Sequence, residues 1–101
     1  MLTKVFEEYS EALKKETFET TEDLYSSDGW QEFISELAYR KVKIKQFEEE
    51  NPKGFGAVQK NGYRHIIPFR KFVIFFESIG WDPQEANHLT SHVMFELENE
   101  R

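Results

Sequence analysis

Apolar residues recur at three- and four-residue spacing in four stretches of the chain, and each stretch predicts an amphipathic helix. The stretches cover residues 1–15, 28–50, 68–79 and 82–98, and phenylalanine dominates the third. We expect this third helix to lie at the centre of the fold. The apolar positions expected in the core are Val5, Phe6, Tyr9, Leu13, Phe33, Ile34, Leu37, Phe69, Phe72, Val73, Phe76, Ile79, Leu89, Val93 and Leu97.

Capping residues predict where the second helix begins and ends. Asp28 is a suitable N-cap, because its carboxylate can accept a hydrogen bond from the backbone N–H of Gln31. The helix is expected to run to about Glu50, because the residue before Pro52 avoids the α conformation. Residues 17–27, which precede this helix, are rich in threonine and serine and predict a loop with room for one helical turn.

Similar signals mark the last two helices. Pro68 suits the first position of the third helix, and Gly80 suits a left-handed residue just beyond its end. Residues 82–85, Asp-Pro-Gln-Glu, combine an acidic N-cap, a proline and a glutamate three residues later. The last helix should therefore begin there, and we expect it to fray after Glu98.

Residues 41–45, Lys-Val-Lys-Ile-Lys, allow two interpretations. Their period-two alternation and their two β-branched residues are typical of an edge strand that is protected by lysines. The alternative is a continuation of the second helix, and we prefer the helix here.

A β-hairpin is predicted around Asn61-Gly62, because this dipeptide favours a two-residue type I′ turn. In that register Val58 faces His65 and Ala57 faces Ile66. The expected fold is mainly α: a compact bundle of three to four helices with one small β-hairpin, in a single domain that spans residues 1–101.

Composition limits the compartment and the chemistry. The chain has 101 residues, which is the length of one domain, and no cysteine. Disulfides, thiolate metal sites and a cysteine nucleophile are therefore excluded, and a reducing compartment fits. No apolar run is long enough to cross a membrane, and the first fifteen residues are acidic rather than signal-like. We expect a cytoplasmic protein with no membrane association.

The formal charge of −6 is unevenly distributed along the chain. Residues 1–36 carry a net −7, residues 37–75 a net +6 and residues 76–101 a net −5. Such a layout either gives two opposed surface potentials or is neutralised by pairing within the fold.

The acidic first third favours a protein partner with a basic surface. Small acidic inhibitors combine electrostatic complementarity with aromatic anchors. The residues that we expect at this protein-binding site are Glu7, Glu11, Tyr25, Trp30, Glu32 and Tyr39. The alternative is that these acids only keep the domain soluble.

The basic middle favours a second hypothesis, nucleic-acid binding. Lysine and arginine bind phosphates, and aromatic rings stack on bases. The residues that this alternative uses are Lys41, Lys43, Lys45, Lys60, Tyr63 and Arg64. A third possibility is a homodimer in which an acidic end docks on the basic middle of a second copy.

Metal binding and catalysis find little support. Glu85, His88, His92 and Glu96 share one helix face, but this spacing is more typical of a solvated face than of a metal site. The chain has no glycine-rich phosphate loop and no nucleophile motif. We therefore expect no cofactor, no metal and no enzyme activity. The sequence favours a small, non-catalytic binding protein that inhibits or regulates a macromolecular partner, of the phage, plasmid or immunity type.

Overall fold

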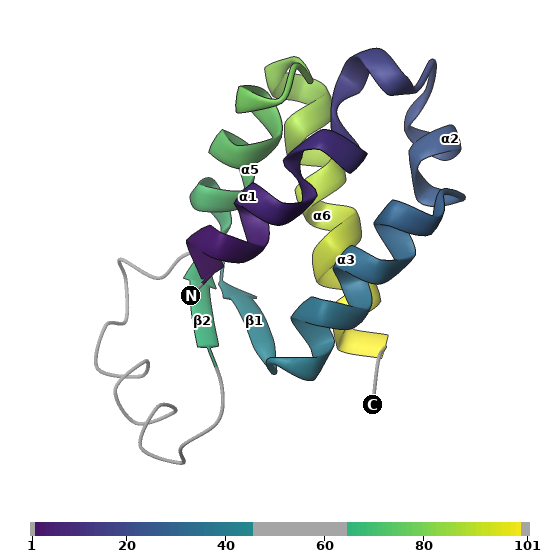
Figure 1. Ribbon diagram of the computed structural model, residues 1–101. Coiled ribbons are helices and arrows are strands. Elements are labelled where there is room, and N and C mark those ends of the chain that lie inside the picture. The colour runs from purple at the N-terminus through teal and green to yellow at the C-terminus, as the bar shows by residue number, and fades with distance from the viewer. Residues whose placement is uncertain (1, 46–64, 100–101) are drawn as a thin grey trace.

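The computed structural model describes residues 2–45 and 65–99 and shows a mainly α fold with a small β element (Figure 1). In chain order its elements are α1 (Leu2–Leu13), the short 3₁₀ helix η1 (Lys15–Thr17), α2 (Thr21–Tyr25), α3 (Asp28–Tyr39), β1 (Val42–Lys45), β2 (His65–Pro68), α5 (Phe69–Ser78) and α6 (Pro83–Asn99). Within the described residues, no helix combines the length and the apolar character that crossing a membrane requires.

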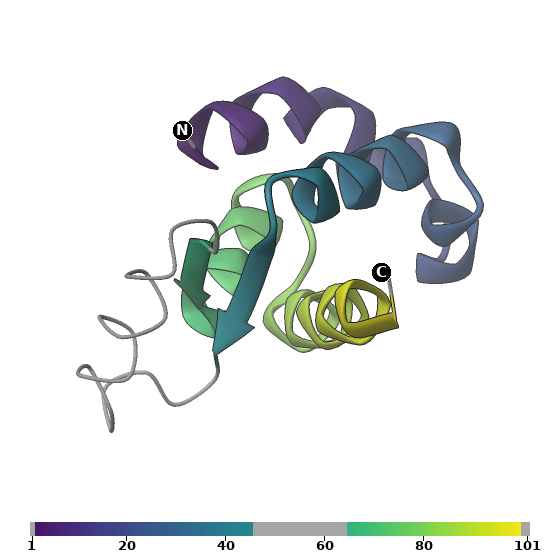
Figure 2. The ribbon, with the colours of Figure 1, turned by 90° about the horizontal axis from the view of Figure 1, so that it is seen from below.

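The helices form two layers, with α1 and α3 on one side of α5 and α6 (Figure 2). Aromatic rings fill the space between the layers. Phe6 of α1 stacks on Phe75 with the ring centroids 4.4 Å apart, and Trp30 of α3 lies 6.2 Å from Phe76. Phe72 and Phe76 are fully buried, so α5 is central as expected, and every residue expected in the core is buried or half-buried.

The segment after α3 corrects the preferred interpretation of residues 41–45. The helix ends at Tyr39 and does not continue to Glu50, and Val42–Lys45 forms strand β1. Lys41, with φ of 59°, turns the chain out of the helix. The strand alternative is therefore right: its odd-numbered lysines face solvent while Val42 and Ile44 are each only 6% exposed. Such alternation buries both β-branched side chains only in an extended chain.

The described sheet is parallel. In β1 and β2, Val42 pairs with His65 and Lys45 with Pro68. The predicted hairpin placed His65 opposite Val58 instead, and its turn at Asn61-Gly62 lies outside the described residues. Strand β2 thus takes its described partner from a segment 23 positions earlier in the chain, and local turn residues do not encode that pairing.

Two predicted helix starts are wrong by one residue. Ser27 rather than Asp28 caps α3: its hydroxyl accepts a hydrogen bond from the backbone N–H of Trp30 at 3.2 Å, and Asp28 is the first helical residue. Pro68 is the N-cap of α5 and the last residue of β2, because its extended backbone, with ψ of 139°, continues the strand.

The predicted junction between α5 and α6 is confirmed. Gly80 has a φ of 108°, and the backbone N–H of Trp81 donates to the carbonyl of Phe76 at 3.2 Å, as in a Schellman motif. Asp82 and Glu85 then bond reciprocally, each carboxylate accepting the other residue's backbone N–H, at 2.7 and 3.3 Å. These caps set the hairpin-like turn that brings α6 against α5.

Candidate functional site

Helices α1 and α3 approach each other closely where Ala12 faces Gly29. A Cβ atom on Gly29 would lie 2.9 Å from the Cβ of Ala12, so only glycine allows this approach. The close crossing brings the polar flanks of the two helices together. This crossing of α1 and α3 positions the residues of the candidate site.

Tyr9 of α1 packs against α3, with its ring centroid 5.5 Å from that of Phe33, and the carboxylates of Glu32, Glu36 and Glu8 are near enough to act on its hydroxyl. Burial is the main cause that raises the pKa of Tyr9, and these three carboxylates raise it further. Glu36 forms an ion pair with Arg40, Nε to Oε2 2.6 Å. Glu8 and Glu32 form no ion pair with any described residue, so no described cation neutralises their charge.

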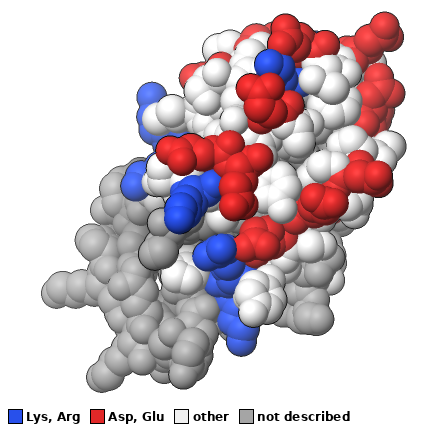
Figure 3. Space-filling model, in the orientation of Figure 1, with Lys and Arg blue, Asp and Glu red and all other residues white. Residues whose placement is uncertain are grey.

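Two further acids extend this charge along the outer side of α1. Glu7 and Glu11 are exposed, and Glu11 pairs with Lys14 at 3.1 Å. We name the five carboxylates of Glu7, Glu8, Glu11, Glu32 and Glu36 the acidic face. Figure 3 shows acidic side chains over α1 and α3, with most of the visible lysines and arginines toward the end of the molecule that carries β1.

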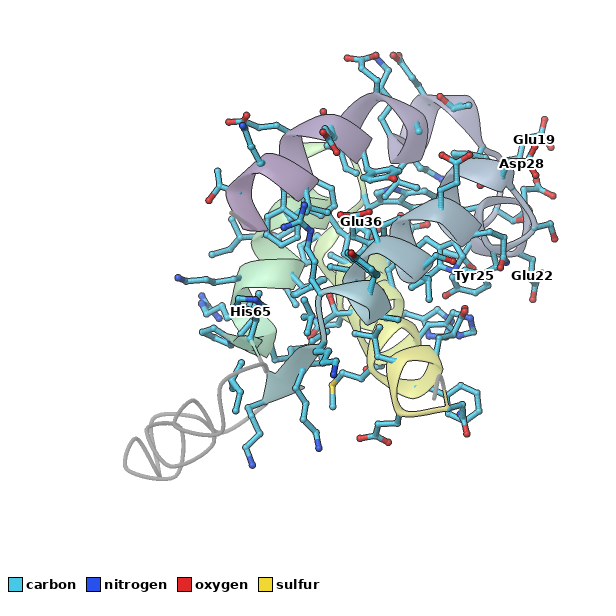
Figure 4. The ribbon with its side chains drawn as sticks, turned by 60° about the horizontal axis from the view of Figure 1, so that its bottom comes forward. Glu19, Glu22, Tyr25, Asp28, Glu36 and His65 are labelled. Atoms are coloured by element: carbon cyan, nitrogen blue, oxygen red, sulfur yellow. The ribbon has the colours of Figure 1, made fainter. Side chains whose placement is uncertain are left out.

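The three aromatic residues expected as anchors have different environments. Tyr39 is 84% exposed and lies one and two helical turns from Glu36 and Glu32, on the same side of α3. Trp30 is fully buried, so its expected role as a surface anchor is wrong. Tyr25, the last residue of α2, is half-buried and lies on the other side of α3 from Glu36 (Figure 4).

The residues of the nucleic-acid hypothesis are only partly described. Lys43 and Lys45 are exposed on β1 and Lys41 is exposed just before it, whereas Lys60, Tyr63 and Arg64 lie outside the described residues. Two more exposed cations, Arg70 and Lys71, follow β2 in the first turn of α5. The sheet end of the molecule is therefore basic.

The described residues hold no group of three or more histidines, aspartates and glutamates that could bind a metal ion. In the predicted ladder, Glu85 instead contacts the backbone of Asp82 and lies 3.7 Å from Lys15. His92 contacts Glu96 at 2.6 Å. The predicted ligands therefore do not form one cluster: Glu85 belongs to a helix cap, and His92 pairs with Glu96.

An open cleft of about 650 Å³ lies where the end of α1 meets the end of α5. Its charged side chains neutralise one another, because Lys14 contacts both Glu11 and Glu16, at 3.1 and 2.9 Å. The remaining lining residues are Ser10, Lys15, Ser78, Ile79 and Gly80. Lys14, Glu11 and Glu16 are therefore paired with one another rather than available to a ligand in the cleft.

No protein-family model matches the chain. Comparison with curated proteins and with solved structures gives no significant match. The function proposed for the candidate site is therefore inferred from its geometry and charge.

The expected protein-binding site contains three members of the acidic face, Glu7, Glu11 and Glu32, whereas Glu8 and Glu36 belong only to the wider acidic first third of the chain. The four-residue spacing of Glu32 and Glu36 was a visible signal that they share a helix side. Nothing local indicated that this side would meet Glu8, since that depends on which helices pack together.

Proposed function

We propose that this protein is a non-catalytic binding protein that inhibits or regulates a protein partner with a basic surface. The observation that carries the proposal is the row of exposed carboxylates on the crossed helices α1 and α3, of which Glu8 and Glu32 form no ion pair with a described residue, together with the exposed ring of Tyr39 at the end of α3. A cytoplasmic location and an inhibitor or immunity-like role of the phage or plasmid type belong to the same proposal.

Physical chemistry supports this use of the acidic face. Uncompensated carboxylates on two rigid helices accelerate encounter with a basic partner and orient it. An exposed tyrosine supplies contact area at low entropic cost, as binding hot spots require. Tyr39 lies close enough along α3 for a partner to cover it together with Glu36.

Affinity capture from a lysate of the source cells tests the proposal. The unchanged protein should retain a basic protein that elevated salt releases, because salt screens exposed charges. The charge-reversal variant Glu8→Lys/Glu32→Lys should lose that protein, and Tyr39→Ala should retain less of it.

The matched control is Glu77→Lys/Glu98→Lys, which makes the same charge change at exposed positions on α5 and α6. It should retain the captured protein as the unchanged chain does. Equal capture by both reversal variants would contradict the proposal, because net charge alone would then account for binding.

Nucleic-acid binding is the second candidate, and the basic sheet end of the molecule favours it. Fluorescence anisotropy with a mixed-sequence DNA duplex and with single-stranded RNA, at about 50 and 200 mM salt, tests this candidate. Binding that depends steeply on salt and disappears in Lys43→Glu/Lys45→Glu would favour it over the protein-binding proposal.

A homodimer that joins the acidic face to the basic sheet end of a second copy remains the third candidate. Sedimentation velocity would show a dimer that dissociates as salt rises. Either reversal variant, at Glu8 and Glu32 or at Lys43 and Lys45, should then be monomeric.

A further inference from the structure

A second surface, on the opposite side of α3 from the acidic face, is built from aromatic rings. Phe95, in the last two turns of α6, is 63% exposed. Its ring centroid lies 6.4 Å from that of His92, which is stacked on Tyr25 of α2 at 3.8 Å and 17°. His88 lies 6.4 Å from the same tyrosine. We name Tyr25, His88, His92 and Phe95 the aromatic face.

A carboxylate lies at the edge of the aromatic face. The Oε2 atom of Glu96 accepts the indole N–H of Trp30 at 3.0 Å and contacts Nε2 of His92 at 2.6 Å. Both contacts hold the side chain in place, and both use the same oxygen. Among the described residues, Oε1 therefore keeps its lone pairs for another donor, and the side chain is 24% exposed.

The Asp and Glu side chains supply all the formal charge of the helices that form and border the aromatic face. None of α2, α3 and α6 contains a lysine or an arginine. Glu96 contacts His92, which stacks on Tyr25, and the carboxylates of Glu96 and Glu22 add to the rise in the Tyr25 pKa that burial mainly causes and the Thr21 side chain opposes. A cationic group is the charge-complementary occupant of such a surface.

We infer that the aromatic face binds an arginine side chain of a protein partner, with the guanidinium stacked on the rings of Phe95 and His92 and donating to Oε1 of Glu96. Arginine fits better than lysine because its guanidinium is planar, weakly hydrated and able to stack while it donates hydrogen bonds in its own plane. This contact uses different residues from the acidic face, so it holds or fails separately from the proposed function.

Nuclear magnetic resonance titration of the ¹⁵N-labelled protein with acetyl-Gly-Arg-Gly-amide tests the inference. We expect saturable shifts at Phe95, His92 and Tyr25, smaller shifts with the lysine peptide, and none with the citrulline peptide, which has the same shape without the charge.

Two variants make the test specific. Phe95→Ala should weaken peptide binding about fivefold, the size of a single cation–π contact. Ile74→Ala, which truncates a comparably exposed apolar side chain on α5, should leave it unchanged. Circular dichroism of both variants confirms that they are folded.

Three results would overturn the inference. They are the absence of shifts on α6 at the highest peptide concentration, equal shifts with the citrulline or the lysine peptide, and undiminished binding by folded Phe95→Ala. Shifts confined to the acidic face would also overturn it while leaving the proposed function intact.

Discussion

At the scale of single residues, Tyr25 has the most unusual environment. Its hydroxyl oxygen is buried and forms no hydrogen bond of regular geometry with a described group. Burial is the main cause that raises the pKa of Tyr25 to about 12; the Thr21 side chain opposes the rise, and the carboxylates of Glu96 and Glu22 add to it. The ring is nevertheless well packed, because it stacks on His92 and lies 5.1 Å from Trp30. The stabilising part of this side chain is thus its ring and not its hydroxyl.

The first prediction is that Tyr25→Phe stabilises the protein at pH 7 by about 1 kcal/mol. A buried polar atom without a hydrogen bond of regular geometry costs free energy, and phenylalanine removes it while keeping the ring. Urea denaturation of both proteins measures the difference. A clear loss of stability in the variant would contradict the prediction, because it would mean that the hydroxyl has a stabilising partner.

The second prediction concerns alkaline pH. The Tyr25 pKa is about 12 in the folded protein and 10.0 for an unperturbed tyrosine, so the unfolded chain loses this proton first. Stability that is present below pH 10 is therefore lost as pH rises toward 12, by about 1 kcal/mol once screening by solvent at this half-buried side chain is allowed for. Denaturation at pH 9 and pH 11.5 should show a larger loss for the unchanged protein than for Tyr25→Phe. Equal losses would contradict it.

At the scale of elements, the contact between α1 and α3 depends on one small residue. Gly29 lies in the first turn of α3, where a larger residue would collide with Ala12. Helix propensity alone favours alanine at a helical position by about 1 kcal/mol. The structure therefore gives up some intrinsic helix stability in exchange for a close crossing that assembles the acidic face.

The third prediction is that Gly29→Ala destabilises the protein by about 1 kcal/mol. Overpacking typically costs about 1–3 kcal/mol, and the gain in helix propensity offsets only part of it. The matched partner is Ala12→Gly, which removes the colliding atom. In thermal or urea denaturation the double variant should be more stable than the sum of the two single effects. Strict additivity would contradict direct contact between these positions.

At the scale of the whole molecule, α5 joins the two layers. Its phenylalanines contact α1 through Phe6 and α3 through Phe33 and Trp30. The acidic helices α1 and α3 form one layer, and the basic strand β1 lies at one end of the molecule (Figures 1 and 3). The charge segments of the sequence are thus also separated in space, and pairing within the fold involves few of the described charges.

The fourth prediction is that Phe76→Ala costs about 3–5 kcal/mol in the free energy of unfolding, because it opens a cavity between the layers. Ile74→Ala, two residues earlier and 54% exposed, should change stability by about 0.5 kcal/mol or less. Urea denaturation separates the two. A similar loss in both variants would contradict the central position of α5.

The sequence by itself determined the features that depend on neighbouring residues. The turn at Gly80, the reciprocal cap of Asp82 and Glu85, and the buried face of α5 were all predicted, because backbone sterics and helical periodicity act over a few residues.

The tertiary structure alone decided the features that depend on residues distant in sequence. Residues 42–45 became a strand because β2 offers a parallel partner, and Trp30 became core because α3 packs on α5 and α6. The same holds for the acidic face, since carboxylates of α1 and of α3 share one surface only because the two helices cross. Pairing and packing energies come from contacts between distant segments, and the local pattern of one segment carries no information about its partner.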